Sequence, residues 1–108
     1  MTHRCVRRVR FPGLASDPGH DVARRTMSGF GSLISIELPD AKTADAFIDA
    51  CLLWVFATSL GGVESTLERR RRWPGELPTV PEGLVRLSVG IEHVEDLWAD
   101  LAQALDQL

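Results

Sequence analysis

Four stretches of the sequence either alternate apolar and polar side chains or form short apolar runs. We predict β-strands at residues 5–11, 33–38, 52–58 and 83–91, and the end of a helix is the alternative for residues 52–58. The last of these is the clearest. Its alternation places Arg86 and Ser88 on one face of the strand and Val85, Leu87 and Val89 on the other.

Apolar residues spaced three and four apart predict helices between the strands. One is expected to run to about Met27, with Asp17 as its cap and Pro18 at its first position. A second is expected from an Asp40 cap to about Cys51. The third covers residues 94–108, and acidic residues lie at its start, where the helix dipole favours negative charge.

The order of these elements is strand, helix, strand, helix, short strand, loop, strand, helix. It predicts an α+β fold, in which a mixed sheet of about four strands carries helices packed on one face. The charged and proline-containing stretch Glu68–Pro81 is expected to be a surface loop. The length of 108 residues indicates a single domain, residues 1–108.

Composition narrows the function classes. A hydrophobic fraction of 44% and a net charge of −3 are ordinary for a globular domain and argue against general electrostatic binding to nucleic acid. The longest apolar run, about Ala50–Ala57, is too short to cross a bilayer, so we expect no membrane association and a cytoplasmic location. Cys5 and Cys51 do not form a disulfide framework, and the three histidines lack metal-site spacing, so no metal is expected.

Four segments stand out in this order along the chain. They are VRRVRFPGL at 6–14, MSGFGSLIS at 27–35, SLGGVES at 59–65 and LVRLSVGIE at 84–92. Singly they are weak signals, since the glycines of the second segment lack the third glycine of a dinucleotide fingerprint. Together, over residues 6–108, they resemble the C-terminal domain of the trans-sulfuration enzymes that use pyridoxal phosphate (PLP), with cystathionine γ-lyase and cystathionine γ-synthase most similar. Ser32 departs from the glycine that is usual there.

The resemblance implies the small C-terminal domain of a fold-type I PLP enzyme and a role for Arg86. In the family this arginine binds the α-carboxylate of the amino-acid substrate. A planar guanidinium suits that task because two parallel N–H groups can hold both carboxylate oxygens. The alternative is a structural pair between Arg86 and Glu64 or Glu92.

The resemblance also implies that Ser59 is a substrate-binding residue, beside the cofactor lysine and the substrate carboxylate. The alternative is a turn serine bonded to nearby backbone. Thr58 and Leu60 are expected to border the site. Thr58 stands where many relatives carry glutamate, which leaves the choice between lyase and synthase open.

PLP chemistry requires a lysine that forms a Schiff base with the cofactor. The chain's only lysine, Lys42, lacks the sequence context of the family's cofactor lysine, so we expect it to be a surface residue. We therefore expect no catalytic residue in this chain, no covalently bound PLP and no activity without the missing large domain. A fragment, a truncated gene and one part of a two-chain enzyme remain alternatives.

Two further kinds of partner are suggested by the sequence. Arg69–Arg72 with Trp73 could bind nucleic acid, but a solvated loop is the favoured interpretation. The alternative function is a non-catalytic interaction or self-association module, in which the chain forms a homo-oligomer through surface left uncovered by the large domain.

Overall fold

Five short strands pair into one mixed sheet in the computed structural model, which describes residues 3–108. The strands are β1 (Arg8–Arg10), β2 (Leu33–Glu37), β3 (Val55–Phe56), β4 (Thr66–Arg69) and β5 (Leu84–Ser88). Their order is β1-β2-β5-β4-β3, and all neighbours are antiparallel except β3 and β4. The α+β class with a mixed sheet is confirmed, and β5 lies at the centre of the sheet.

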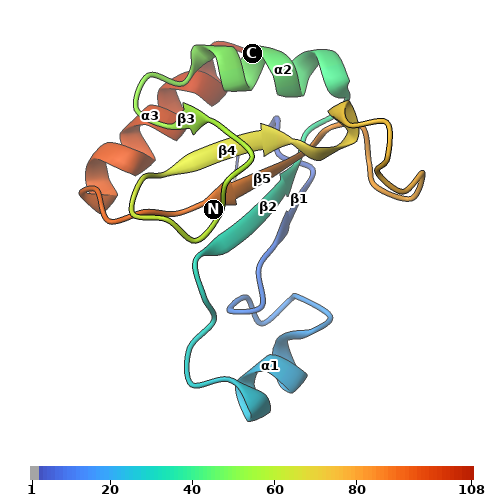
Figure 1. Cartoon of the computed structure of the whole chain (residues 1–108), viewed down its shortest axis with the longest axis vertical. Helices are drawn as coiled ribbons and strands as arrows, with labels where there is room; N and C mark the ends of the chain where they lie inside the picture. The colour runs from blue at the N-terminus through green and yellow to red at the C-terminus, as the bar shows by residue number, and fades with distance from the viewer. Residues whose placement is uncertain (1–2) are drawn as a thin grey trace.

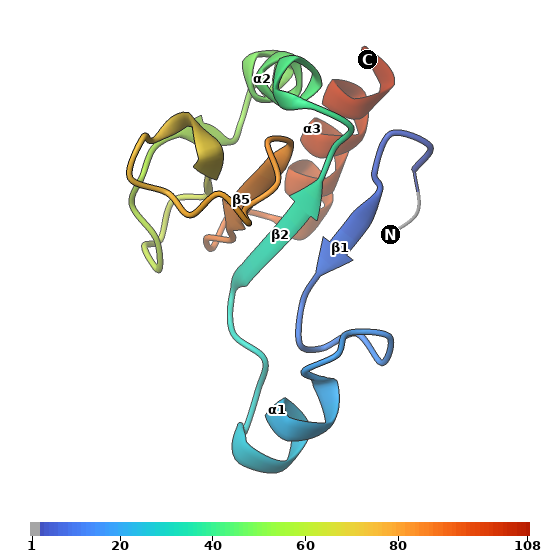
Figure 2. The same ribbon diagram turned by 90° about the vertical axis from the view of Figure 1, so that its right-hand side faces the viewer.

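Two of the helices cover one face of the sheet. α2 (Ala41–Ala50) and α3 (Val94–Asp106) lie together on this face (Figure 1). The third, α1 (His20–Thr26), lies away from the sheet at the end of two connecting segments (Figures 1 and 2). A short 3₁₀ turn, η1 (Arg70–Arg72), follows β4.

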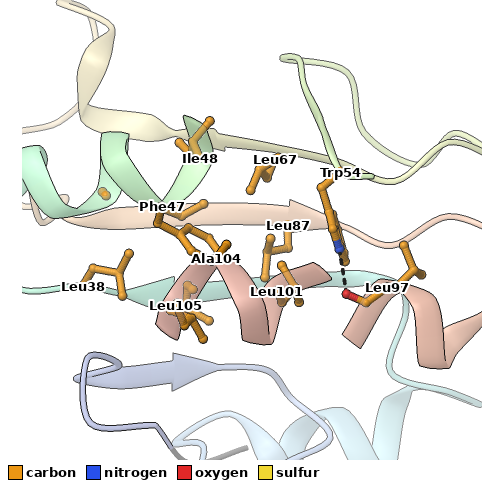
Figure 3. Packing of buried hydrophobic residues seen from close by; sticks show 13 residues of the cluster. Leu38, Phe47, Ile48, Trp54, Leu67, Leu87, Leu97, Leu101, Ala104 and Leu105 are labelled. Carbon is orange, nitrogen blue, oxygen red and sulfur yellow. Dashed lines mark hydrogen bonds between the residues drawn. The ribbon is translucent and has the colours of Figure 1, made fainter. Parts of the chain in front are cut away.

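The core lies between the sheet and these two helices. The sheet contributes Ile36, Val85 and Leu87 to this core. Figure 3 shows Phe47 of α2 and Leu101 of α3 on the side of the sheet from which Leu87 projects. All five side chains are buried. The predicted alternation of the last strand is thus confirmed on its apolar side.

The opposite face of the sheet is polar at its centre, and neither α2 nor α3 covers it (Figure 1). Ser35 of β2, Arg86 of β5 and Glu68 of β4 are aligned across three neighbouring strands. Because successive side chains on a strand point to opposite faces, all three point away from the core. We call this surface the open face.

The predicted loop Glu68–Pro81 is wrong at its beginning. Glu68 and Arg69 belong to β4, and Glu68 is fully buried. The strand is short and carries charge on its open-face side, so its sequence has the composition of a loop, and only pairing with β5 reveals it. The strands predicted at 5–11 and 52–58 are also shorter than expected.

Helix starts were predicted with mixed success. The Asp40 carboxylate accepts the Thr43 N–H at 2.7 Å, which confirms this cap. α1 instead begins at His20, and Asp17 accepts the main-chain N–H groups of Phe11 and Gly19. Asp17 therefore joins the end of the β1 segment to the turn before the helix rather than capping it.

Residues 3–108 contain neither a membrane-spanning helix nor a candidate metal site. No helix in this range is long and apolar enough to cross a membrane. The same residues contain no group of three or more His, Cys, Asp or Glu side chains placed to hold a metal ion.

Candidate functional site

Arg86 lies on the central strand, where its side chain reaches across the open face. Its Nη2 donates to the Thr58 carbonyl at 2.7 Å and to Glu68 Oε1 at 2.8 Å. Its Nε and Nη1 have no acceptor among residues 3–108. The side chain is 18% exposed, so three N–H donors remain on a partly exposed guanidinium that is anchored by its other nitrogen.

The partner of Arg86 is Glu68, the residue directly opposite it on β4. Glu68 is buried, with a side chain 1% exposed, and its Oε2 accepts the indole N–H of Trp73 at 3.2 Å. The expected alternative partners, Glu64 and Glu92, were wrong. Glu64 is exposed, and Glu92 accepts from Ser65 instead.

Residues 58–61 form a loop that lies beside Arg86 and is fastened by main-chain contacts. The Ser59 carbonyl accepts from Thr66 Oγ1 at 2.9 Å, and the Gly61 N–H donates to Ser88 Oγ at 2.9 Å. Gly61 has a φ of +75°, a conformation that glycine adopts without the strain a side chain would add. We call residues 58–61 the site loop.

The site residues predicted from the sequence meet here through the backbone. Thr58 contacts Arg86 directly, and Ser59 and Leu60 follow it on the exposed side of the site loop. The Ser59 hydroxyl makes no hydrogen bond with residues 3–108, and its carbonyl is the group that is bonded. Of the predicted residues, Thr58 thus has a direct contact with Arg86, and Ser59 is held in the site loop through its carbonyl.

Sequence reasoning missed the buried polar contacts that hold the segment after the site loop. Ser65 is fully buried; its Oγ donates to Glu92 and accepts the Gly90 N–H at 2.8 Å. The hydrogen bond from the Ser65 N–H, followed by that from the Ser65 hydroxyl, lowers the pKa of the Glu92 carboxyl. The signal was present, since these residues belong to the segments at 59–65 and 84–92.

The arginine run Arg69–Arg72 is held by partners within the protein. Arg70 donates to Glu68, and hydrogen bonding to this glutamate raises the pKa of the Arg70 guanidinium. The full set of partners is Asp45 and Glu82 for Arg69, Glu68 and Glu76 for Arg70, Glu82 and the carbonyls of Pro78 and Val80 for Arg71, and the rings of Phe56 and Trp73 for Arg72. The run is thus neither a free basic patch nor a simply solvated loop. It orders the segment between β4 and β5.

Lys42 lies far from this constellation in the architecture. It is exposed in the first turn of α2, on the layer that covers the core face, whereas Arg86 points to the open face. Since no other lysine occurs in the chain, these residues do not fit a covalent PLP site. They fit a group that holds an anionic part of a ligand.

Comparison with known proteins gives consistent results. The model of the Cys/Met metabolism PLP-dependent enzyme family matches residues 1–106. A candidate cystathionine gamma-lyase of Streptomyces coelicolor is 52% identical over 99 residues, which are 92% of this chain and 25% of that protein. A cystathionine beta-lyase of Lactococcus lactis is 41% identical over 98% of this chain and 30% of its own length.

The fold is also found in solved structures of this group. The metB protein of Corynebacterium glutamicum superimposes with a TM-score of 0.89 at 41% identity, over 97% of this chain and 29% of its own length. Cystathionine gamma synthase from Xanthomonas oryzae, in complex with aminoacrylate and cysteine, superimposes with a TM-score of 0.90 at 38% identity. That similarity covers 97% of this chain and 30% of the other. The chain thus spans between a quarter and a third of the length of these relatives, and it belongs to the family of Cys/Met metabolism PLP-dependent enzymes.

Proposed function

We propose that residues 1–108 are the C-terminal, substrate-carboxylate-binding domain of a PLP-dependent trans-sulfuration enzyme of the cystathionine γ-lyase or γ-synthase type. The observation that carries the proposal is Arg86, fixed at Nη2 on the central strand while Nε and Nη1 have no acceptor among residues 3–108. A cationic group on a rigid strand fixes the orientation of a carboxylate better than one on a loop.

In this proposal the substrate carboxylate binds the guanidinium of Arg86. Charge-assisted hydrogen bonds of this kind are about twice as strong as neutral ones, and the planar fork fixes direction as well as charge. The free hydroxyl of Ser59 supplies one further donor at the rim of the site, and Thr58 and Leu60 border it. The chain contributes binding and orientation, whereas the lysine and the phosphate-binding groups come from the large domain.

The test is a chimera with a solved relative. The recipient is the metB protein of Corynebacterium glutamicum. This chain replaces the matching segment, and cystathionine formation and cleavage are measured. We expect the chimera to be catalytically active. Introducing Arg86→Lys into it should raise the KM for the amino-acid substrate by about 100-fold, since a lysine lacks the bidentate fork.

The matched control is Arg24→Lys, an exposed arginine of α1 whose ion pair with Asp21 is weak at 3.9 Å. Its kinetic constants should equal those of the unmodified chimera. Equal KM values for Arg86→Lys and Arg24→Lys would refute the proposed role of Arg86.

The isolated chain is proposed to be inactive. Mixed with PLP and cystathionine, it should release no keto acid and develop no cofactor absorbance that survives gel filtration. Turnover by the 108-residue chain would overturn this part of the proposal. We further propose a cytoplasmic location, which the free thiols of Cys5 and Cys51 support because reducing compartments preserve them.

A second function is favoured by an apolar surface near the site loop. Val63 and Ile91 are 68% and 81% exposed and lie next to each other, since the Ile91 N–H donates to the Val63 carbonyl at 2.9 Å. Val94 and Trp98 extend the exposed apolar side chains along α3. A self-associating module would use such a surface. Size-exclusion chromatography over a range of concentrations tests it, and a monomer throughout would remove it.

A further inference from the structure

Glu68 is a buried carboxylate shared by two arginines. Its Oε1 accepts from Arg86 at 2.8 Å and also from Arg70, while Oε2 is held by the indole of Trp73. A buried carboxylate is costly unless it is paired and hydrogen-bonded, and here both oxygens are satisfied. Glu68 therefore has a fixed position directly beside Arg86.

This arrangement bears on the charge of the site. If Arg86 were the sole partner of Glu68, the two charges would cancel and little field would remain for an incoming carboxylate. Arg70 changes that balance, since it supplies a second positive charge to the same oxygen. The nearest set of Glu68, Arg70 and Arg86 carries a formal charge of +1.

Glu76 is the second acid that pairs with Arg70, on the side away from Glu68. It pairs with Arg70 at 3.0 Å but makes no contact with Glu68 or Arg86 among the hydrogen bonds of residues 3–108. Its side chain is 22% exposed, against 1% for Glu68, so solvent screens its charge more strongly. The charge of Glu76 therefore influences Arg86 less than the charge of Glu68 does.

We propose that Arg70 is a positioning residue for the site. It shares the charge of the buried Glu68, and this leaves the guanidinium of Arg86 electropositive toward a carboxylate ligand. Arg70 acts without touching that ligand. The inference rests on the proposed function only for the identity of the carboxylate as that of an amino-acid substrate.

Acetate, the simplest carboxylate, is the probe, and the 108-residue chain is the sample. The side-chain Nε–H signal of Arg86, identified by its loss in Arg86→Lys, is followed by ¹⁵N NMR during titration. Arg70→Gln should weaken acetate binding by about fivefold, and Glu68→Gln should tighten it by about fivefold, because each removes one charge next to Arg86. The double variant restores the net charge of +1 and should lie within about twofold of the unmodified chain.

Two matched variants separate charge from shape. Arg70→Lys keeps the charge and should bind acetate as the unmodified chain does. Glu76→Gln removes the more exposed acid that pairs with Arg70 and should change the affinity for acetate by less than about twofold. Thermal unfolding of each variant confirms that the fold is retained. If Arg70→Gln fails to fold, the comparison of Glu68→Gln with the double variant replaces it, because these two differ by the charge of Arg70 alone.

The inference is overturned if Arg70→Gln binds acetate like the unmodified chain, if the affinity of the double variant departs from that of the unmodified chain by much more than twofold, or if acetate leaves the Arg86 signal of the unmodified chain unmoved. The proposed function is decided separately, by the effect of Arg86→Lys on the chimera. If the Arg70 and Glu68 variants all bind acetate equally, while Arg86→Lys still impairs the chimera, only the inference about Arg70 is removed. If these variants change acetate affinity as expected, while Arg86→Lys leaves the KM of the chimera unchanged, only the proposed function is removed.

Discussion

The carboxylate of Asp100 on α3 accepts the main-chain N–H of Trp54 at 3.0 Å, across 46 residues of sequence. The same carboxylate accepts the N–H groups of Leu52 and Leu53 at 2.8 and 2.7 Å, and Gln103 donates to it as well. Trp54 in turn donates its indole N–H to the Leu97 carbonyl at 3.1 Å (Figure 3). Asp100 thus fixes the turn that leads into β3 and, beyond it, the site loop.

Replacing Asp100 with alanine should destabilise the domain. Three consecutive backbone N–H groups lose a charged acceptor in a part-buried setting, and we expect a loss of about 3 kcal/mol in the free energy of unfolding. Urea denaturation followed by tryptophan fluorescence measures it. The control is Asp49→Ala on the exposed side of α2, which should change stability by no more than about 0.5 kcal/mol. Similar midpoints for the two variants would contradict this account.

The same carboxylate should make the protein sensitive to acid. Burial raises the pKa of Asp100, but hydrogen bonds from Leu52, Trp54, Leu53 and Gln103 together outweigh it, and the pKa lies below the ordinary 3.8. A lowered pKa in the folded state means that its contribution is present above about pH 4 and is lost as the pH falls through the folded value. Stability measured from pH 6 to pH 2 should therefore fall less steeply in Asp100→Asn than in the unmodified protein. Parallel curves would exclude this role.

Local patterns predicted the elements that depend on local interactions. The Asp40 cap is a contact with a residue three positions away, and the alternation around Val85 and Leu87 reports one buried face. These features need no knowledge of distant segments. The class of fold followed from them.

Features formed between distant segments were not predicted from the sequence. Glu68 became the partner of Arg86 only through the register of β4 against β5, whereas the sequence had suggested Glu64 or Glu92 as the paired acid. Asp100 was one acid in an acidic helix until the turn at Leu52 was placed against it. The placement of Arg86 on the open face was predictable, whereas the identity of the groups around it required the three-dimensional pairing.

The thiol of Cys51 should react slowly with alkylating reagents. Burial, and next the nearby charge of Asp100, raise its pKa to about 12 from an ordinary value of 9.0. The thiolate is the reactive form, so alkylation at pH 8 should be about a thousandfold slower in the folded chain than in denaturant. A Cys5→Ser background leaves Cys51 as the remaining cysteine, and iodoacetamide labelling followed by mass spectrometry gives the rate. Equal rates in the folded and denatured chain would contradict the burial of this thiol.

Gly90 should tolerate no side chain, because two backbone segments meet at its Cα. A Cβ added there would lie 2.2 Å from the Val63 carbonyl oxygen and 2.7 Å from the Ser65 nitrogen. Both atoms are backbone and belong to the segment that follows the site loop, so relief of the clash would break the Gly90 to Ser65 hydrogen bond at 2.8 Å. We expect Gly90→Ala to lower the free energy of unfolding by about 3 kcal/mol.

Gly75→Ala is the matched control for that change, since an added Cβ there meets no atom within 4 Å. It should leave stability unchanged or raise it slightly, through the lower entropy of the unfolded chain. Urea unfolding of both variants gives the comparison, and ¹⁵N NMR of the folded Gly90→Ala chain should show the signal of Gly61 displaced, because the site loop continues directly into Val63. If Gly90→Ala unfolded at the same urea concentration as Gly75→Ala, the close approach of these two segments would be wrong, and with it the support it gives to the loop beside Arg86.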